Sequence, residues 1–444
     1  MNIGLIGSGG REHAIADALL QNPQRDRLIV YGNSENVGIQ RIASVYHKGS
    51  LTDNDAIIAF FQENQADYVV IGPELPLING AADALRAVNI PALGPNRFQA
   101  QLEGSKTFMR NLMQAQVGWG SLRWQKVTGI EEAREFISEV GQAVIKPIGL
   151  TGGKGVQVMG EHLNSIDEAL SLVEQILRVD GEVLLEERLI GEEFSRIALI
   201  SDGTIIPMPI AQDFKYAYEG DKGGMTGGMG SYTMANGSMP FLQESDLQQA
   251  DKLMAEVVAA LEKLSGNPYR GFLYGQFMAT RSGVTIIEFN VRLGDPEAIN
   301  VMSLFKCDVA ELFHQAAKGA LNPEGVQFEK QATLCKYLVP VGYPEKTQKD
   351  LTFQFDESLV QHAGFKVRFA SVEKCDPVFN TLGSRTLAII GKGPTPGEIS
   401  EKLEKLLERI EPPLLRHRKD IGTETTLIQK TEHMLQLRSN NHHA

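Results

Sequence analysis

The chain has 444 residues, too many for a single hydrophobic core, so we expect two to four packed units. Its composition, with 42% apolar and 22% charged residues, is that of an ordinary globular protein and gives no reason to expect disorder. The net charge of −12 argues against a protein that coats nucleic acid, so local basic and backbone groups would have to bind any small anionic ligand.

The three cysteines, Cys307, Cys335 and Cys375, are widely spaced and form no C-x-x-C pair. They predict neither a zinc site nor a disulfide framework and fit a reducing compartment. A strand pattern begins directly at residue 2, without the charged region and cleavage signature of an export signal. No apolar run is long enough to cross a bilayer. We therefore expect a cytoplasmic protein with no membrane partner.

Residues 1–103 alternate short apolar runs with helical patterns, which is typical of a parallel α/β domain. Strands are predicted near 3–6, 27–31, 68–72 and 91–93, and helices near 11–21, 53–63 and 79–88. Two sharp loops, 7–13 and 72–74, follow predicted strands. Because open α/β sheets bind ligands at the carboxyl edge of their strands, both loops are candidate substrate contacts.

The first of these loops resembles a dinucleotide-binding fingerprint only in part. That fingerprint requires glycine or alanine at position 12, where this chain has Glu12. A helix that begins near Arg11 would still direct free N–H groups and its positive dipole end at a phosphate. The loop therefore predicts a sugar phosphate rather than NAD.

Residues 104–190 predict a small α+β unit with helices at 104–114, 131–140 and 165–177 and strands at 122–127, 142–146, 155–159 and 182–187. Gly152 and Gly153 would let backbone N–H groups approach phosphate oxygens, and Lys154 adds charge, although the Walker A pattern is absent. A plain hairpin would also explain the glycines. Lys146 ends an apolar strand, and because lysines are rarely buried without a partner, a nucleotide contact is the better interpretation.

The strand at 182–187 runs into a polar linker that could offer backbone groups to an adenine edge. Glu193, just beyond it, could accept hydrogen bonds from ribose hydroxyls. Taken alone, this segment is more typical of a solvated acidic turn.

Residues 191–328 are mostly strands, with one clear helix at 244–264 whose apolar residues recur at helical spacing. Asp213, a candidate to hold a substrate amine, precedes a run at 223–230 with five glycines in eight positions. Such a run is too permissive for a core element and predicts a mobile ligand loop.

The strand that ends near 291 carries the most informative chemistry. Glu288 and Asn290 are two residues apart and therefore share one face of the strand. A carboxylate beside an amide oxygen suits Mg²⁺ or Mn²⁺. Arg292 continues that face and adds a positive charge suited to a γ-phosphate and an acyl phosphate. A buried strand that ends in a charged turn would explain the same pattern.

Residues 329–424 predict a further small α/β unit, with strands near 333–339, 365–370 and 386–390 and a helix at 396–410. The tail at 425–444 is polar and has no strong period, so we expect it to fray. The histidines lack the H-E-x-x-H spacing of zinc enzymes, and the chain has no nucleophile elbow.

Several motifs together resemble the phosphoribosylamine–glycine ligase (glycinamide ribonucleotide synthetase) family, ATP-grasp enzymes of purine biosynthesis. They are Gly-Gly-Arg-Glu-His-Ala at 9–14, Gly-Pro-Glu at 72–74, Leu-Glu-Gly-Ser-Lys at 102–106, Gly-Gly-Lys-Gly-Val at 152–156, Thr-Gly-Gly-Met-Gly at 226–230, Glu-Phe-Asn-x-Arg-x-Gly-Asp-Pro-Glu at 288–297 and Arg-Lys-Asp-Ile-Gly at 418–422. The resemblance extends from Gly7 to about Gly422. The opening motif, the Thr-Gly-Gly-Met-Gly motif and the closing motif together are specific to this family.

The resemblance implies an α/β and α+β multidomain protein with the ATP-grasp fold. It implies an N-terminal pre-ATP-grasp domain at 1–103, an ATP-lid subdomain at 104–190, a central domain with a metal site at 191–328 and a small C-terminal domain at 329–424, followed by the polar tail.

The implied reaction joins glycine to 5-phosphoribosylamine through glycyl phosphate, with conversion of ATP to ADP and phosphate. The partners would be these small molecules, with no nucleic acid, and the chain would be a monomer or a weak homodimer. The implied cofactors are ATP and either Mg²⁺ or Mn²⁺.

The resemblance also implies site residues. ATP contacts would come from Lys106, Lys146, Gly152, Gly153, Lys154, Glu186, Glu187, Leu189 and Glu193. Substrate contacts would come from Gly9, Gly10, Arg11, Glu12, Pro73, Glu74, Asp213, Lys215, Gly228, Arg292 and Gly294, with Asp213 and Arg292 as catalytic residues. Glu288, Asn290 and Gln276 would bind the metal. Gln276 stands where many ATP-grasp enzymes have a carboxylate.

Two alternatives remain open on the sequence alone. Another ATP-grasp ligase, such as a purine carboxylase or a formate-dependent ligase, would share the acyl-phosphate step but would respond to bicarbonate or formate instead of glycine. A dinucleotide-binding regulatory protein would bind NAD tightly and have no affinity for ATP. Glu12 and the strand carrying Glu288 speak against the second alternative.

Overall fold

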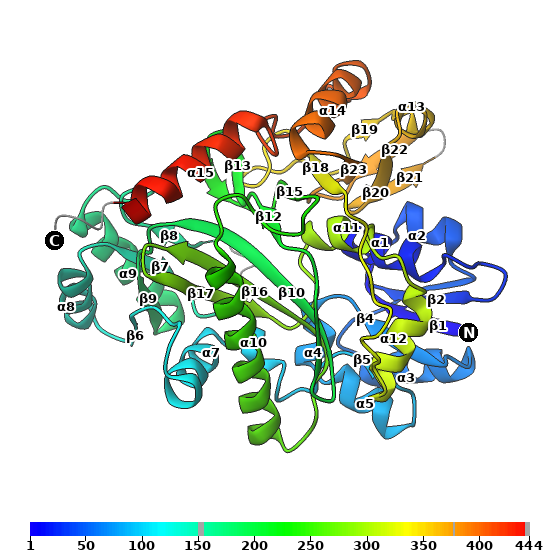
Figure 1. Cartoon of the computed structure of the whole chain (residues 1–444), viewed down its shortest axis with the longest axis horizontal. Coiled ribbons are helices and arrows are strands. Elements are labelled where there is room, and N and C mark those ends of the chain that lie inside the picture. Colours follow the sequence, from blue (N-terminus) through cyan, green and yellow to red (C-terminus); the bar gives the residue numbers. More distant parts are fainter. Residues whose placement is uncertain (150–154, 376–377, 440–444) are drawn as a thin grey trace.

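The computed structural model describes residues 1–149, 155–375 and 378–439. In Figure 1 the N-terminal domain lies at one end of the molecule and the lid at the other, with the large central sheet between them. One hydrophobic core runs through the N-terminal, central and C-terminal parts, whereas the lid has a separate core within 127–185. The lid is therefore the part of the chain that is least tied to the rest by apolar packing.

The N-terminal domain is a parallel sheet in the order β3-β2-β1-β4-β5, as the alternating pattern predicts. Its elements are β1 (Asn2–Ile6), α1 (Gly10–Leu19), β2 (Arg27–Gly32), α2 (Val37–Ile42), β3 (Val45–Lys48), α3 (Asn54–Glu63), β4 (Tyr68–Ile71), α4 (Glu74–Ile78), α5 (Ala81–Ala87) and β5 (Ala92–Leu93). The strand order reverses between β1 and β4, so the loops that follow these two strands flank one crevice. The sequence pattern missed β3, because this edge strand is only partly buried and has no apolar run.

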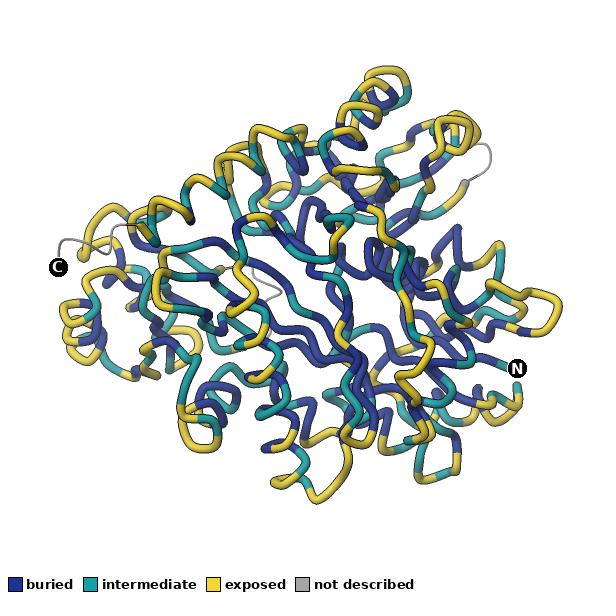
Figure 2. Tube along the Cα trace, in the orientation of Figure 1, coloured by how far each residue is buried: buried dark blue, intermediate teal, exposed yellow. Residues whose placement is uncertain are grey.

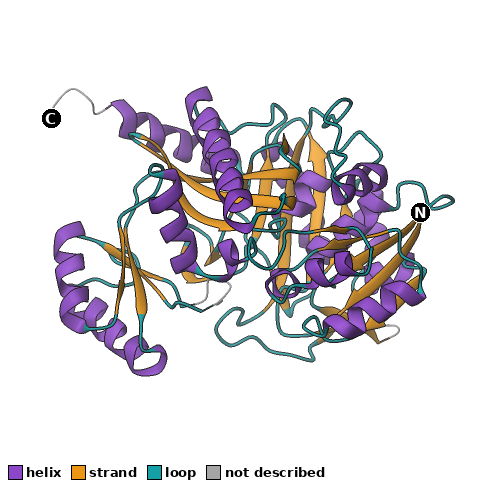
Figure 3. Cartoon of the chain, turned by 90° about the horizontal axis from the view of Figure 1, so that it is seen from below, coloured by secondary structure: helices purple, strands orange, loops and turns teal. Residues whose placement is uncertain are grey.

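The lid is an antiparallel sheet in the order β6-β9-β7-β8, with two helices on one face (Figure 3). Helix α6 (Gln101–Gly104), helix α7 (Lys106–Leu112) and a π-helix (Met113–Val117) lead into it. Its elements are β6 (Trp124–Val127), α8 (Ile130–Val140), β7 (Ala143–Lys146), β8 (Gln157–Val158), α9 (Ile166–Asp180) and β9 (Val183–Glu187). The predicted phosphate contacts Gly152, Gly153 and Lys154 lie outside the described residues.

The central and C-terminal parts share one sheet, whose main path is β17-β16-β10-β12-β15-β18-β23-β20. The central strands are β10 (Glu192–Ser201), β11 (Thr204–Pro207), β12 (Ala211–Asp213), β13 (Tyr216–Tyr218), β14 (Lys222–Met225), β15 (Gly230–Thr233), β16 (Arg270–Thr280) and β17 (Gly283–Asn290), with helices α10 (Glu244–Ser265), α11 (Glu297–Met302) and α12 (Val309–Lys318). The pairing of β15 with β18 joins the two parts. The sequence predicts a separate C-terminal unit and gives no sign of this continuity.

The C-terminal part contributes β18 (Ala332–Pro340), β19 (Thr352–Phe353), α13 (Glu357–His362), β20 (Lys366–Phe369), β21 (Val372–Cys375), β22 (Val378–Thr381), β23 (Leu387–Gly393), α14 (Pro396–Ile410) and β24 (Leu415–Arg416). Strands β18 and β23 are buried, while α14 exposes its polar face (Figure 2). Among the described residues, no helix is both long enough and apolar enough to span a membrane.

The expectation that the tail frays is wrong for the part that is described, because Glu424–Ser439 form helix α15. This helix runs from the C-terminal part toward the lid (Figure 1). Lys430 and His433 pair with Glu192 at 2.8 and 2.7 Å, and Arg438 pairs with Asp246 at 2.8 Å. Met434 is 1% exposed and Leu427 and Leu437 pack against the same core, so apolar contacts and ion pairs to distant residues together hold the helix in place. Because Ile428 and Leu435 are exposed, the apolar residues of the helix do not form one clear stripe in the sequence.

Candidate active site

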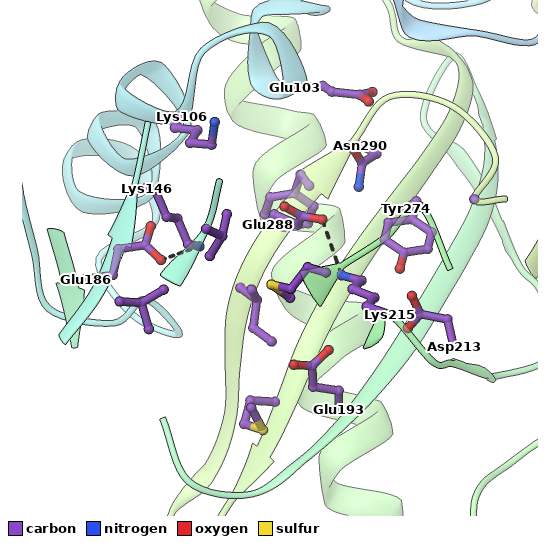
Figure 4. Close-up of a pocket in the computed structure, with 18 of the residues that line it drawn as sticks. Glu103, Lys106, Lys146, Glu186, Glu193, Asp213, Lys215, Tyr274, Glu288 and Asn290 are labelled. Carbon is purple, nitrogen blue, oxygen red and sulfur yellow. Dashed lines mark ion pairs between the residues drawn. The ribbon is translucent and has the colours of Figure 1, made fainter. Parts of the chain in front are cut away.

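A cavity of about 510 Å³ lies where the lid, the central sheet and the N-terminal domain meet. Its lining includes many of the predicted site residues: Arg11, Glu74, Lys106, Lys146, Glu186, Glu187, Leu189, Glu193, Asp213, Lys215, Glu288, Asn290, Arg292 and Gly294. The predicted residues Gly9, Gly10, Glu12, Pro73, Gly228 and Gln276 are not part of the lining. Figure 4 shows how charged side chains from several domains face this space.

Glu288, on β17, presents its carboxylate to the cavity, with 43% of its side chain exposed. Among the described residues its ion partner is Lys215, whose Nζ lies 3.5 Å from the carboxylate (Figure 4). Burial opposes the charge of Glu288, but nearby cations, foremost Lys215 and Lys146, outweigh burial and lower its pKa to about 2. The carboxylate is therefore ionised and only loosely paired.

Asn290 follows on the same face of β17, as the alternation of the strand predicts. Its Oδ1 accepts a hydrogen bond from Arg292 Nη2 at 3.3 Å. Glu288 and Asn290 thus bring two hard oxygen ligands to one wall of the cavity.

Lys106 and Lys146 line the cavity on the lid side, across from Glu288 and Asn290 (Figure 4). Lys106, at the start of α7, donates to the carbonyl oxygens of Pro147 and Gly149 at 2.9 and 2.7 Å. Burial and the neighbouring Lys146 lower the pKa of Lys106. These lysines concentrate positive charge where the sequence predicts the phosphates of a nucleotide.

The carboxylate of Glu186 has a different environment, because it is fully paired inside the protein. Arg110 Nε and Lys146 Nζ lie 2.8 and 2.6 Å from it, and Glu186 is 2% exposed. Burial would raise the pKa of Glu186, but the two cations outweigh burial and lower it. The side chain therefore positions Lys146 and leaves ligand contacts to the backbone that follows.

Backbone groups after β9 are divided between the lid sheet and the cavity. The N–H of Glu187 donates to the Arg123 carbonyl at 2.9 Å, and that of Arg188 donates to the Gln142 carbonyl at 3.0 Å. The N–H of Leu189 has no hydrogen-bond partner among the described residues. Apolar side chains complete this end of the cavity: Met109, Leu122, Val144, Val158, Met278 and Ile287. An apolar slot beside a free N–H group can hold an adenine ring.

A buried polar cluster on the central sheet centres on Gln276 of β16. Its Nε2 donates to Glu193 at 2.8 Å and to Asp213 at 3.4 Å, while its Oε1 accepts from Ser195 Oγ at 3.2 Å and from the hydroxyl of Tyr274. The two carboxylates fix the orientation of the amide, because only its NH₂ group can donate to them. The oxygen of Gln276 is therefore already used, which argues against the predicted metal contact.

The two carboxylates of this cluster resist ionisation. Burial raises the pKa of Asp213 to about 7, against the attraction of Lys215, and burial also raises the pKa of Glu193. Lys215 carries the balancing charge, and its pKa is raised because Glu288 and Asp213 outweigh burial. An aspartate that titrates near neutrality can accept a proton from a reacting amine.

Arg292 is held by two acidic side chains. Its guanidinium lies 2.9 Å from Glu103 and 3.4 Å from Glu74, and its Nη1 donates to the Leu293 carbonyl at 3.1 Å. Its buried Nε has no hydrogen-bond partner among the described residues. That Nε faces Glu74, so carboxylates hold the guanidinium on two sides, and Arg292 lines the cavity as a fixed positive charge that could bind an anionic ligand.

Glu103 was missed as a site residue, although it lies in one of the family motifs. It also accepts a hydrogen bond from the N–H of Val291 at 2.8 Å. Burial raises its pKa to about 7, against the attraction of Arg292. Its position three residues before Lys106 was the available signal, but its partner is distant in the sequence.

Glu12 supports the two N-terminal loops from beneath. Its carboxylate accepts from the N–H of Gly9 at 2.6 Å and from Arg11 Nε at 2.5 Å. A Cβ atom at Gly72 would lie 2.3 Å from Glu12 Oε1, so glycine is required for the second loop to approach. Glu12 thus positions the loops, while Arg11 reaches the cavity and donates to the Leu293 carbonyl at 3.1 Å.

Arg385, from the C-terminal part, was also missed. Its Nη1 donates to the carbonyls of Gly227, Gly228 and Asp295 at 2.7, 2.9 and 2.9 Å. Its guanidinium stacks over the ring of Tyr337 at 4.4 Å. Arg385 therefore holds the Thr-Gly-Gly-Met-Gly loop against Asp295, near the end of the motif at 288–297. No local pattern marks this arginine, because its partners come from other domains.

The donor set fits a divalent cation of the Mg²⁺ class. Among the described residues, no group of three or more His, Cys, Asp or Glu side chains could hold a metal ion by itself. Mg²⁺ is commonly bound by one or two protein oxygens together with substrate phosphates and water. The ionised Glu288 and the neighbouring amide oxygen of Asn290 meet that requirement.

Comparison with known proteins identifies the family. Models of the N domain, the ATP-grasp (A) domain and the C domain of phosphoribosylglycinamide synthetase match residues 1–103, 104–298 and 333–424. A phosphoribosylamine–glycine ligase of Methanoregula boonei is 42% identical over 440 residues, which cover 98% of this chain and 100% of the relative. The chain belongs to the phosphoribosylglycinamide synthetase family. The ATP-grasp fold and the family resemblance predicted from the motifs are thereby confirmed.

Other members of the phosphoribosylglycinamide synthetase family agree over the whole length. A phosphoribosylamine–glycine ligase of Pyrococcus furiosus is 40% identical over 443 residues, covering 98% of this chain and 97% of the relative. The crystal structure of a phosphoribosylamine–glycine ligase from Thermotoga maritima superposes with a TM-score of 0.77 at 28% identity, covering 95% of this chain and 100% of that one. The chain is thus an ATP-grasp ligase, and the dinucleotide-binding alternative is wrong.

Proposed function

We propose that this protein joins glycine to 5-phosphoribosylamine at the expense of ATP, giving glycinamide ribonucleotide, ADP and phosphate in purine biosynthesis. The names of the full-length relatives supply the two substrates. The observation that carries the proposal is the ionised, loosely paired carboxylate of Glu288, which shares one cavity with Lys146, Lys215 and Arg292. Such a site suits the transfer of a phosphoryl group to a carboxylate.

ATP would bind at the end of the cavity formed by the lid. Its adenine would lie in the apolar slot and accept a hydrogen bond from the N–H of Leu189. Lys106 and Lys146 would attract the phosphates. Glu193 would accept hydrogen bonds from the ribose, and Gln276 supports this role because its amide holds the carboxylate in place.

Glu288 and Asn290 would hold a divalent cation, which we propose to be Mg²⁺ or Mn²⁺. When bound there, the ion would offset the negative charge of the ATP phosphates. Gln276 is better placed as a support for its neighbours than as a third ligand, because Ser195 and Tyr274 already donate to its oxygen.

In the first step, a carboxylate oxygen of glycine would attack the γ-phosphorus of ATP and displace ADP, forming glycyl phosphate. Arg292 would orient the glycine carboxylate, since it lines the cavity and Glu103 and Glu74 fix its guanidinium. The contribution of the protein is positioning and charge stabilisation, and the lid would exclude water from the acyl phosphate.

In the second step, the amine of phosphoribosylamine would attack the acyl carbon, and phosphate would leave. Asp213 would take the proton that the nitrogen loses, for which its pKa of about 7 is suitable. Arg11 and the free N–H groups at the start of α1 would bind the phosphate of the ribosyl group. Glu74 and Lys215 would complete this end of the site.

We further propose that the chain acts as a monomer or weak homodimer in the cytoplasm. One chain lines the whole cavity, so the proposed chemistry needs no residue from a second copy. The cysteine usage suits a reducing compartment.

Incubation with ¹⁸O-carboxyl glycine, ATP and 5-phosphoribosylamine tests the reaction. We expect one labelled oxygen in the inorganic phosphate, because the activated carboxylate oxygen leaves with the phosphoryl group. Parallel reactions with bicarbonate or formate in place of glycine should release no phosphate above background. Phosphate release that depends on either of those, or unlabelled phosphate with glycine, would contradict the proposal.

A further inference from the structure

The hairpin formed by β13 and β14 (Tyr216–Met225, called the link hairpin below) touches the lid. The hydroxyl of Tyr216 donates to Glu161 Oε2, and the ring of Tyr216 stacks on His162 with centroids 5.8 Å apart. Glu161 also pairs with Arg188 at 2.7 Å, on the linker beside the adenine end of the cavity. This contact joins the lid to the central domain across the nucleotide site.

The other end of the link hairpin runs directly into the substrate loop, Thr226 to Gly230. The N–H and the hydroxyl of Thr226 both donate to the carbonyl of Lys215, at 2.7 and 2.8 Å. The N–H of Gly228 in turn donates to Thr226 Oγ1 at 3.0 Å. Lys215 is the residue before Tyr216 and its side chain faces Glu288. The segment Lys215–Tyr216 therefore contacts the lid, the substrate loop and the strand that carries Glu288 and Asn290.

The closing family motif, Arg418 to Gly422, holds the link hairpin from below. Arg418 is 1% exposed, and its Nη1 donates to the Tyr216 carbonyl at 3.0 Å and to Asp221 at 2.9 Å. Asp420 pairs with Arg418 at 2.6 Å and accepts from the N–H of Gly220 at 3.0 Å. The proposed reaction assigns no role to this motif, although the family resemblance singled it out.

We propose that the link hairpin couples the closed position of the lid to the substrate loop, with Arg418 as the positioning residue that fixes it for both. The identities of the ligands rest on the proposed function above. Because Arg418 donates a hydrogen bond to the carbonyl of Tyr216, it fixes the position of the Tyr216 hydroxyl, which donates to Glu161. The same backbone segment determines where Lys215 and Thr226 lie.

Replacement of Tyr216 by phenylalanine tests the lid contact. Y216F keeps the ring stack on His162 but removes the hydrogen bond to a carboxylate, so we expect ADP affinity to fall about tenfold in a direct titration. Y218F is the matched control, because Tyr218 lies on the same hairpin but stacks under Arg416 at 4.3 Å. The control should bind ADP within about twofold of the unchanged protein.

A double-mutant cycle tests whether Tyr216 and Glu161 act as one contact. If they do, Y216F combined with E161Q should weaken ADP binding by no more than the larger single effect. Additive losses, or a Y216F titration that matches Y218F, would overturn the lid half of the proposal.

Replacement of Arg418 by methionine tests the coupling. R418M should raise KM for both ATP and 5-phosphoribosylamine, each about tenfold, whereas R418K should recover part of both. D221N removes a half-exposed partner of Arg418 and should shift both KM values in the same direction by a smaller factor. This variant keeps the test valid if R418M does not fold.

A change in KM for one substrate only, or unchanged KM values with lowered thermal stability, would overturn the coupling. If the unchanged protein showed no ligase activity, that result would instead contradict the proposed function. The ADP titrations would still report on the lid contact in that case, so the two failures are distinguishable.

Discussion

Two glutamates in the cavity, Glu186 and Glu288, lie among cations yet have opposite environments (Figure 4). Glu186 is 2% exposed and forms ion pairs at 2.6 and 2.8 Å, so its charge is already neutralised. Glu288 has 43% of its side chain exposed and, within the part of the chain that the structure describes, one loose pair at 3.5 Å. The role of a carboxylate in an active site therefore has to be judged by how much of its charge is left unpaired by the protein. We infer that Glu186 stabilises the fold, whereas the carboxylate of Glu288 is available to bind a ligand.

The same distinction separates the two amides that the sequence predicts as metal ligands. Asn290 presents its side chain to the cavity, where its oxygen accepts a weak hydrogen bond at 3.3 Å from Arg292. Gln276 is fully buried and uses both ends of its amide. Both residues are typical ligands by chemistry, and only their hydrogen-bond partners tell them apart.

The largest expected effect is on activity at Glu288. E288Q keeps the shape of the side chain but removes the charge that we propose to bind the cation, so kcat/KM for ligation should fall by about 10³-fold. Thermal unfolding should change little, because the lost protein contact is loose. Steady-state kinetics and a thermal melt check the pair of outcomes, and a fully active E288Q would remove Glu288 from the metal site.

The next largest effect is on stability, at the partner of Glu186. R110M breaks a fully buried ion pair and the hydrogen bonds from Arg110 to the carbonyls of Ile286 and Ile287, so the free energy of unfolding should fall by about 3–5 kcal/mol. Denaturant unfolding measures this loss.

The matched control is R123M, which breaks an exposed pair with Glu139 and should cost at most about 1 kcal/mol. Equal losses in R110M and R123M would contradict the view that burial makes the Glu186 cluster structural.

A smaller effect on activity is expected at Gln276. Q276E would place a third carboxylate against Glu193 and Asp213, so kcat/KM should fall by about 10–100-fold. S195A, which removes one hydrogen bond to the amide oxygen, serves as the milder control. If Gln276 were a metal ligand, Q276E would instead tighten binding of Mn²⁺, and a metal titration separates the two outcomes.

The smallest effect concerns stability and pH at Asp213. The pKa of Asp213 is about 7 in the folded protein, above its ordinary value of 3.8, so the ionised form penalises folding. That penalty grows as pH rises from about 4 to 7 and is constant above pH 7. D213N removes it, so the variant should melt about 2 °C higher at pH 8 and show little advantage at pH 5.

Melting curves of the ligand-free protein in chelator check this pH dependence. D213N should also be less active, since it loses the proposed proton acceptor. A stability gain that does not change with pH would show that Asp213 is not the titrating group.

Much of the lid and the N-terminal domain could be predicted because local patterns carry them. Short apolar runs mark β1 and β4 in the N-terminal domain and β7 and β9 in the lid. Element ends shifted by only a few residues, as for α8, predicted at 131–140 and observed at Ile130–Val140. In contrast, α15 was missed, because its apolar residues do not form one clear stripe: Met434 is buried while Ile428 and Leu435 are exposed.

In the candidate site, too, relations between residues close in the sequence could be predicted, and relations between distant residues could not. Spacing of two residues on one strand was enough to place Glu288 and Asn290 on one face. The sequence could not show that Glu103 holds Arg292, or that Arg385 holds the substrate loop, since each pair spans more than one hundred residues. Nor could it show that Gln276 is already satisfied.

Short apolar runs, strand alternation and motif spacing were enough to predict the parallel N-terminal sheet, the family and the shared strand face of Glu288 and Asn290. Local sterics, strand alternation and motif spacing act within a few residues, so they can be recognised in a single sequence. Which charges are neutralised and which stay free for ligands could be read from the three-dimensional structure but not from the sequence. Neutralisation depends on distances between side chains from different domains, and folding alone brings those side chains together.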